Sequence, residues 1–101
     1  MRVIRPAVYI LASRRNGTLY IGVTGDLAAR LSVHQQGTVD GFTQRYRVHL
    51  LVFYEEFNTM LEAIAREKKL KKYSRAAKIA LIETDNPGWQ DRAAEIMTWR
   101  G

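Results

Sequence analysis

The first half of the chain contains short apolar runs separated by polar breaks. Ala7–Ala12 is rich in residues that favour strands, and Leu19–Val23 is a second run of the same kind. The segment between them, Arg14–Gly17, ends in Asn-Gly, which is one of the strongest signals for the turn of a β-hairpin. A third extended run covers His49–Phe57. We therefore expect an N-terminal antiparallel hairpin and one further strand.

A helix is expected between the second and third strands. Asp26 belongs to the residue types that cap helix N-termini, and Leu27 and Leu31 follow at the spacing of one helix face. The stretch Gln35–Arg47 contains Gly and Gln and is interpreted as a loop. The helix and the loop together would connect the hairpin to the third strand.

The second half of the chain has a helical pattern. Thr59 and Glu62 have the spacing of a capping box, which begins a second helix. Ser74 is the expected cap of a third helix, which ends at Asn86–Gly88, and Trp89–Met97 is expected to form a short last helix. The predicted order is β-β-α-β-α-α-α. This order indicates an α+β fold in which helices flank a small three-stranded antiparallel sheet.

Length and cysteine content limit the possible classes of protein. The chain has 101 residues and no repeat or low-complexity tract, so residues 1–101 are expected to form a single domain. There is no Cys, which excludes disulfides and thiolate metal sites, so a metal would need oxygen or imidazole ligands. No segment has the length of a membrane span or the pattern of a signal peptide, and we expect a cytoplasmic protein.

The charge balance points toward nucleic acid. Lys and Arg number 16 against 10 Asp and Glu, which gives a formal net charge of +6. The segment from Arg66 to Lys78 is especially basic, and cationic side chains attract the phosphate backbone. The alternative interpretation of its lysines is a solvated helix surface without a ligand. The residues expected to bind nucleic acid are Arg14, Arg15, Arg45, Arg47, Lys68, Lys71, Lys72, Arg75 and Lys78.

Two tyrosine motifs give the chain a more specific resemblance. Tyr20–Gly22 has the sequence Tyr-Ile-Gly, and Ala7–Tyr9 places a tyrosine on the preceding strand. Arg30 follows ten residues after Tyr20 on the first expected helix, and Glu67 lies on the basic helix. In this order and on these elements, the motifs resemble those of the GIY-YIG nuclease superfamily. The resemblance is strongest to a small standalone bacterial branch related to the nuclease domain of the excision-repair excinuclease.

The resemblance implies an endonuclease that hydrolyses phosphodiester bonds of DNA with one divalent ion, Mg²⁺ or Mn²⁺. Glu67 would be the metal ligand, Arg30 the cation at the phosphate and Tyr20 the base that activates water. Tyr9 would hold the water or the phosphate, and His34 would orient a phosphate or relay a proton. These residue types suit the chemistry, because a hard ion accepts a carboxylate and a guanidinium fork fits two phosphate oxygens.

Further properties follow from the resemblance alone. It implies low or structure-based specificity, a role in DNA repair or recombination, and a protein partner that supplies specificity, because no DNA-recognition domain is evident in the sequence. A non-catalytic nucleic-acid-binding module that kept the fold is the main alternative, and a protein-interaction adaptor is another. Asn86 either matches a family asparagine or is a turn residue before Pro87.

Overall fold

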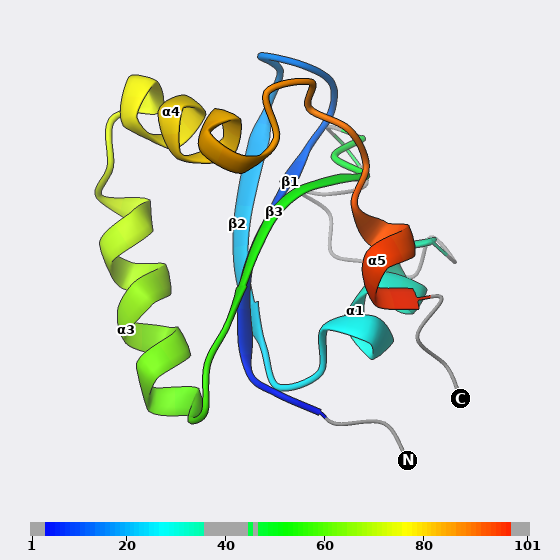
Figure 1. The fold of residues 1–101 in the computed structure, drawn as a ribbon, viewed down its shortest axis with the longest axis vertical. Helices are drawn as coiled ribbons and strands as arrows, with labels where there is room; N and C mark the ends of the chain where they lie inside the picture. Colours follow the sequence, from blue (N-terminus) through cyan, green and yellow to red (C-terminus); the bar gives the residue numbers. More distant parts are fainter. Residues whose placement is uncertain (1–3, 36–44, 46, 98–101) are drawn as a thin grey trace.

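The computed structural model describes residues 4–35, 45 and 47–97. The elements in these residues are β1 (Ala7–Ala12), β2 (Leu19–Thr24), α1 (Leu27–Gln35), β3 (Leu50–Glu56), α3 (Met60–Lys71), α4 (Arg75–Asp85) and α5 (Ala93–Met97). The strands form one antiparallel sheet in the order β2-β1-β3. Helices α3 and α4 cover one side of the sheet, and α1 and α5 cover the other (Figure 1). The predicted α+β fold is confirmed.

The loop expected over Gln35–Arg47 falls mostly outside the described residues, which include only three of its positions, 35, 45 and 47. Within the described ranges, no helix combines the length and the apolar character that crossing a bilayer requires.

The hairpin turn between β1 and β2 forms at the predicted Asn-Gly pair. Asn16 has a φ of 58°, in the left-handed region that Asn tolerates better than most residues. The Gly17 amide donates to the Arg14 carbonyl at 2.9 Å, and the Ser13 amide donates to the Thr18 carbonyl at 3.0 Å. These bonds close the turn and set the register of the two strands.

The central strand β1 is buried along its whole length and divides the core in two. Its even-numbered residues, from Val8 to Ala12, pack with residues of α3 and α4, whereas its odd-numbered residues, from Ala7 to Leu11, pack with residues of α1 and α5. Successive side chains of a strand point to opposite faces, so the two clusters lie on the two sides of the sheet. We call these sides the α3 face and the α1 face.

A β-bulge interrupts the pairing of β3 with β1. Val52 and Phe53 are consecutive, yet both belong to the cluster on the α3 face, because the bulge inserts an extra residue into the strand. Beyond the bulge, Tyr54 lies opposite Tyr9 and packs with the cluster on the α1 face. Glu55, the next residue, lies opposite a β1 residue of the α3 face. The bulge therefore decides which helix each of these two side chains meets.

Helix starts occur at the caps that the sequence predicts. The Thr59 hydroxyl accepts from the Glu62 amide, and the Glu62 carboxylate accepts from the Thr59 amide, which completes the capping box. The Ser74 side chain accepts from the Ala77 amide at the start of α4. Asp26 caps α1 through a bond to a backbone amide of the first turn. All three predicted caps are confirmed.

The segment that follows α4 runs along the outer edge of β3. The Arg92 amide donates to the Leu51 carbonyl at 2.7 Å, and the Leu51 amide donates to the Asp91 carboxylate at 3.1 Å. The buried Asn86 side chain donates to the Val52 carbonyl at 3.1 Å. Backbone groups of an edge strand are thereby satisfied. Asn86, the C-cap residue of α4, thus joins the end of this helix to β3.

The last helix is shorter than predicted. The expected range begins at Trp89, but Trp89 has a φ of 54°, which a right-handed helix does not allow. Its ring is buried in the core, and its Nε1–H donates to the Glu83 carboxylate at 2.6 Å. The Asp91 side chain then accepts from the Ala93 amide, where α5 begins. Packing of the indole therefore overrides the helical pattern of the segment before Ala93.

Candidate active site

Four of the five predicted catalytic residues meet on the α1 face. The ring centroids of Tyr9 and Tyr20 are 6.3 Å apart. The His34 ring lies 6.3 Å from that of Tyr9 and 6.4 Å from that of Tyr20. The Nε–H of Arg30 donates to the phenolic oxygen of Tyr9 at 3.2 Å. Two strands and one helix thus bring two phenols, a guanidinium and an imidazole together.

Gly22 makes this arrangement possible. It lies directly opposite Tyr9 in the β1–β2 pairing. A Cβ atom at this position would stand 2.5 Å from both the Cζ and the hydroxyl oxygen of Tyr9. The Tyr9 phenol therefore extends over the glycine, across β2, which is an edge strand of the sheet. The glycine of the second motif is needed because the aromatic ring occupies the space of a side chain.

Helix α1 presents Arg30 and His34 from one face. The two residues are four apart, while Leu27 and Leu31 are buried against the sheet and fix the helix. The hydrogen bond with Tyr9 raises the pKa of Arg30 above its ordinary value, partial burial opposes this, and Tyr20 adds to the increase. Arg30 is thus held as a cation beside both phenols.

Three of the four side chains in this group are partly exposed to solvent. Tyr9 is only 1% exposed, whereas Tyr20, Arg30 and His34 are half-buried. The Nε2 atom of His34 is itself buried. A ligand would therefore meet Tyr20, Arg30 and part of His34, with Tyr9 behind them as a support for the guanidinium.

Glu67 approaches the sheet from the other side. It follows Ala63 by four residues and precedes Leu70 by three, and both neighbours are fully buried, so it lies on the sheet-facing side of α3. Its side chain is 16% exposed, and Oε2 lies 3.2 Å from the Nζ of Lys71. Helix α3 packs mainly against β2, the strand that the Tyr9 phenol crosses. Glu67 thus lies on the α3 face, on the side of the sheet opposite the other four predicted catalytic residues.

The Glu67 carboxylate suits a metal site with a single protein ligand. In the described part of the chain, no three His, Asp or Glu side chains form a group that could hold a metal ion. Glu67 offers a single, largely buried carboxylate whose present partner is an exposed lysine ammonium. An ion that takes one protein carboxylate and keeps several waters, as Mg²⁺ commonly does, fits this residue.

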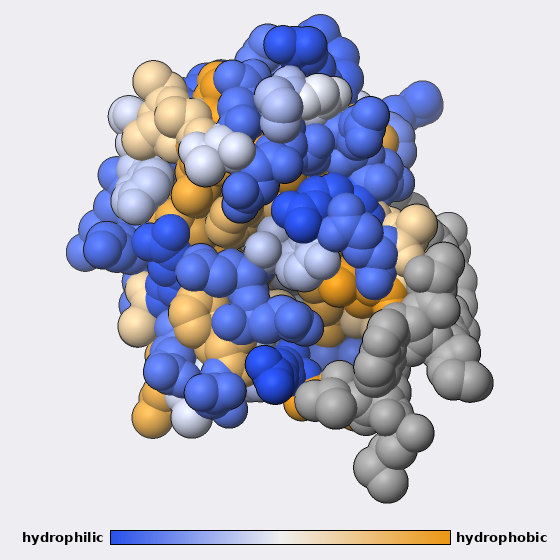
Figure 2. Space-filling model, viewed as in Figure 1, coloured by the Kyte–Doolittle hydropathy of each residue, from blue (hydrophilic) through white to orange (hydrophobic). Residues whose placement is uncertain are grey.

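The predicted nucleic-acid-binding residues occupy several places on the surface. Lys68, Lys71 and Lys72 are exposed at the end of α3, and Arg14 and Arg15 are exposed in the hairpin turn. Hydrophilic side chains gather over the hairpin turn, at the top of the view in Figure 2. Arg45 and Arg47 are exposed, and Lys78 is half-buried on α4.

Arg75 has a structural contact that the sequence does not predict. Its Nη2 donates to the carbonyl of Asn16 at 2.6 Å and to that of Gly17 at 2.7 Å. Arg75 is the first residue of α4, so these bonds tie the start of this helix to the hairpin turn. Its expected contact with nucleic acid stays a prediction, and part of its donor capacity is already used within the protein.

Two clusters of Arg, Glu and Tyr side chains were not singled out from the sequence. One joins Tyr54 to Arg92 and Glu95, and the other joins Glu55 to Arg66. Arg92 and Glu95 are three residues apart, a spacing at which side chains of a helix can pair. The contacts with Tyr54 and Glu55 connect distant segments and leave no such pattern in the sequence.

Comparison with known proteins identifies the family. The model of the GIY-YIG catalytic domain matches residues 5–80, which include all five predicted catalytic residues. A UPF0213 protein of Staphylococcus haemolyticus is 37% identical over 76 residues, which are 75% of this chain and 92% of the relative. A UPF0213 protein of Staphylococcus aureus has the same identity and coverage.

A solved structure supports the assignment. The solution NMR structure of a UPF0213 protein from Bacillus halodurans matches with a TM-score of 0.56 and 26% identity, over 90% of this chain and 96% of that one. The resemblance predicted from the tyrosine motifs is therefore confirmed at the level of the family. The chain belongs to the family of the GIY-YIG catalytic domain, a nuclease family, and is related to the small UPF0213 proteins.

Proposed function

We propose that this protein is an endonuclease that hydrolyses phosphodiester bonds of DNA with one divalent ion, Mg²⁺ or Mn²⁺. The observation that carries the proposal is the contact of Arg30 with Tyr9, beside Tyr20, in a chain of the GIY-YIG family. A phosphate needs a cation and a proton acceptor close together for hydrolysis, and this group of side chains offers both.

Arg30 is the proposed phosphate-binding cation. Negative charge accumulates on the phosphate oxygens during attack by water, and a preorganised cation stabilises it. The bond from Nε to Tyr9 fixes the plane of the guanidinium. A guanidinium held in this way brings its charge to a phosphate without first becoming ordered.

Tyr20 is the proposed base for the attacking water. It is half-buried, and its ring lies beside those of Tyr9 and His34. His34 orients the phosphate or relays the proton from the site, because an imidazole can both accept and donate a proton.

Glu67 is the proposed metal ligand. The ion, when bound, would neutralise charge on the phosphate and stabilise the leaving oxygen. Glu67 belongs to α3, which packs mainly against β2 on the α3 face, and the Tyr9 phenol lies over β2 on the α1 face. We therefore place the two halves of the proposed site at the outer edge of β2, where the two faces of the sheet meet.

The proposed substrate is DNA held mainly through its backbone. Exposed lysines of α3 and exposed arginines of the hairpin turn suit contacts with phosphate, which carry no sequence information. We therefore expect low or structure-based specificity, with a protein partner supplying more. DNA repair or recombination is the setting that the family suggests, and a cytoplasmic location is proposed with it.

A cleavage assay tests the proposal. Wild type and Glu67→Gln are compared on single-stranded, duplex and branched DNA and on RNA, with Mg²⁺, Mn²⁺ or chelator. We expect metal-dependent cleavage of DNA that falls by about a hundredfold or more in Glu67→Gln. Glu56→Gln, which changes an exposed carboxylate at the end of β3, serves as the matched control. Cleavage in chelator, or equal cleavage by Glu67→Gln, overturns the one-metal proposal.

The alternative function makes a different prediction in the same experiment. A non-catalytic binding module would bind DNA in a salt-sensitive manner, keep that binding in Glu67→Gln, and show no turnover with any metal. This alternative has its support in the exposed basic residues rather than in the Tyr9–Arg30 contact.

A further inference from the structure

Two adjacent residues of β3 each hold a helix, and they do so on opposite faces of the sheet. The hydroxyl of Tyr54 donates to the carboxylate of Glu95, on α5, at 2.9 Å. The carboxylate of Glu55 accepts from the Nε of Arg66, on α3, at 3.0 Å. The β-bulge before Tyr54 determines which of the two side chains lies on which face of the sheet. One short stretch of an edge strand therefore anchors helices on both sides.

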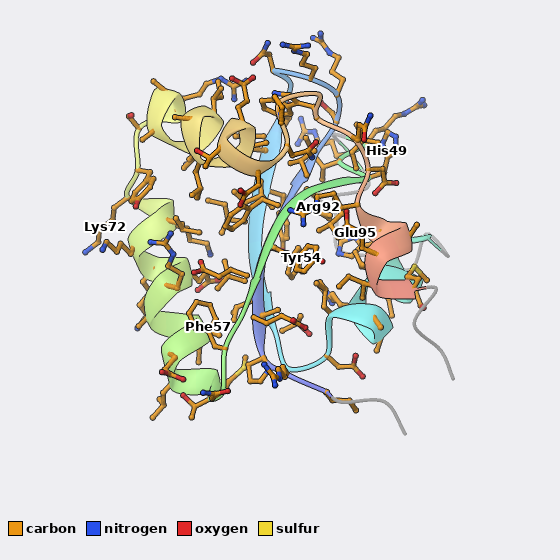
Figure 3. The ribbon with its side chains drawn as sticks, viewed as in Figure 1. His49, Tyr54, Phe57, Lys72, Arg92 and Glu95 are labelled. Carbon is orange, nitrogen blue, oxygen red and sulfur yellow. The ribbon has the colours of Figure 1, made fainter. Side chains whose placement is uncertain are left out.

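The cluster on the α1 face is dense in charge-assisted contacts. The Arg92 guanidinium donates to both carboxylate oxygens of Glu95, at 3.0 and 3.1 Å, and lies over the Tyr54 ring at 4.6 Å from its centroid (Figure 3). The hydrogen bonds from Arg92 lower the pKa of Glu95 below its ordinary value. The carboxylate is therefore ionised near neutral pH, and bidentate pairs of this kind fix orientation as well as distance.

This cluster leads to the helix that carries Arg30. Helix α5 follows Arg92 directly and packs against α1. Ala93 of α5 shares its apolar cluster with Tyr9 and with Leu27 and Leu31 of α1. Fixing α5 on β3 therefore helps to fix α1, the helix that carries Arg30 to Tyr9.

The cluster on the α3 face leads to Glu67. Besides its bond to Glu55, Arg66 donates from Nη1 to the Tyr73 hydroxyl at 3.5 Å, and its guanidinium lies 6.0 Å from the centre of that ring. Arg66 is the residue before Glu67 on the same helix. Holding the Arg66 side chain on β3 limits rotation of α3 about its axis, and that rotation determines where the Glu67 carboxylate points.

We propose that Tyr54 and Glu55 are positioning residues that set the two halves of the candidate site independently. Tyr54 acts through α5 and α1 on Arg30, and Glu55 acts through Arg66 on Glu67. The catalytic consequence rests on the proposed function, whereas the positioning itself does not. Catalytic groups must be held to within about half an ångström to be productive, which makes such anchors necessary.

The cluster of Tyr54, Arg92 and Glu95 lies partly outside the range matched by the family domain. The match to the GIY-YIG catalytic domain ends at residue 80. Arg92 and Glu95 lie after this point, as does the whole of α5. The support of α1 through Tyr54 thus uses residues outside the matched range.

Kinetics as a function of metal concentration separate the two anchors. Tyr54→Phe removes only the hydroxyl, and Glu55→Gln removes only the charge. We expect Glu55→Gln to raise the metal concentration for half-maximal cleavage by about tenfold with little change in the maximal rate, as supports of metal ligands do. Tyr54→Phe should lower the maximal rate by about tenfold with an unchanged metal requirement. Glu56→Gln should change neither.

A nuclear magnetic resonance measurement tests the positioning without relying on activity. Tyr54→Phe should speed hydrogen exchange of the Arg30 Nε–H several-fold and leave the Glu67 carboxyl carbon shift unchanged, and Glu55→Gln should do the reverse. Equal effects of both variants on both signals, or no effect, overturn the proposal. If wild type cleaves nothing with any metal, the proposed function fails, and these two signals still decide the positioning.

Discussion

The Nε–H of Arg30 donates a hydrogen bond of 3.2 Å to the phenolic oxygen of Tyr9, which stands 21 residues earlier in the chain. The bond joins helix α1 to the central strand and uses the donor of Arg30 that is nearest to its backbone. The guanidinium is thereby oriented beside both phenols. This relationship makes the role of Arg30 testable apart from its charge.

Arg30→Lys keeps the positive charge but loses both the fork and the Nε donor. We expect the maximal rate of DNA cleavage to fall by about a hundredfold, the scale of losing one preorganised donor at a developing charge. Single-turnover cleavage at saturating Mg²⁺ measures the change. Arg5→Lys, at an exposed position before β1, is the matched control and should cleave at the wild-type rate. A wild-type rate in Arg30→Lys would remove Arg30 from the site.

Gly22→Ala places a methyl group where the Tyr9 phenol lies, at 2.5 Å from its Cζ and oxygen. Tyr9 is 1% exposed and has little room to move, so we expect a loss of stability of about 1–3 kcal/mol, as in other overpacked cores. Urea unfolding measures it. Gly25→Ala is the matched control, because a Cβ at Gly25 meets no atom within 4 Å. This control should be neutral or slightly stabilising.

The two glycine variants also report on the site. Displacement of the Tyr9 ring should weaken the Arg30 contact, so Gly22→Ala should lose cleavage activity even under conditions in which it is fully folded. Equal stability and activity for Gly22→Ala and Gly25→Ala would show that the phenol has another position available.

Much of the fold follows from local sequence signals. The caps at Asp26, Thr59 and Ser74 and the turn at Asn16 depend on hydrogen bonds within a few residues, so their patterns are visible in the sequence. The positive φ of Trp89 is different, because it follows from packing of the indole in the core. Because of this tertiary contact, the last helix is shorter than the sequence predicts.

The candidate site was predictable only through the family motifs. Nothing local indicates that Tyr9 and Arg30 touch, because the contact depends on the register of the hairpin and on the placement of α1. The link from Tyr54 to Glu95 spans 41 residues and depends on the β-bulge in β3. Neither the bulge nor the link has a sequence signature that pattern analysis could use.

The Glu95–Arg92 pair predicts a dependence of stability on pH. The pKa of Glu95 is lowered in the folded state, below its ordinary value near 4.5, mainly by hydrogen bonds from Arg92. The folded state therefore binds protons less readily than the unfolded state, so this stabilisation is present above pH 4.5 and is lost as the pH falls below it. The free energy of unfolding of wild type should exceed that of Glu95→Gln at pH 7, and the difference should shrink at pH 3. A difference independent of pH would contradict this assignment.

The exposed lysines at the C-terminal end of α3, including its C-cap Lys72, predict a change in the salt dependence of DNA binding. A phosphate contact contributes about one unit to the slope of log affinity against log salt concentration. Lys72→Gln should therefore lower the slope by about one unit and weaken binding equally for different sequences. Arg5→Gln removes an equal charge before β1, and it should leave the slope unchanged. The same slope change in both variants would indicate a diffuse effect of net charge instead of a contact.

The proposed hydrolysis requires that the Glu67 carboxylate and the Arg30–Tyr9 pair border a single site at the edge of β2. Paramagnetic broadening by Mn²⁺ tests it directly, with the Arg30 Nε–H and the Tyr9 ring protons as reporters in wild type and in Glu67→Gln. The predicted result is selective broadening of both reporters in wild type and none in Glu67→Gln at the same Mn²⁺ concentration. Broadening that spares both reporters in wild type, or that persists in Glu67→Gln, would contradict it.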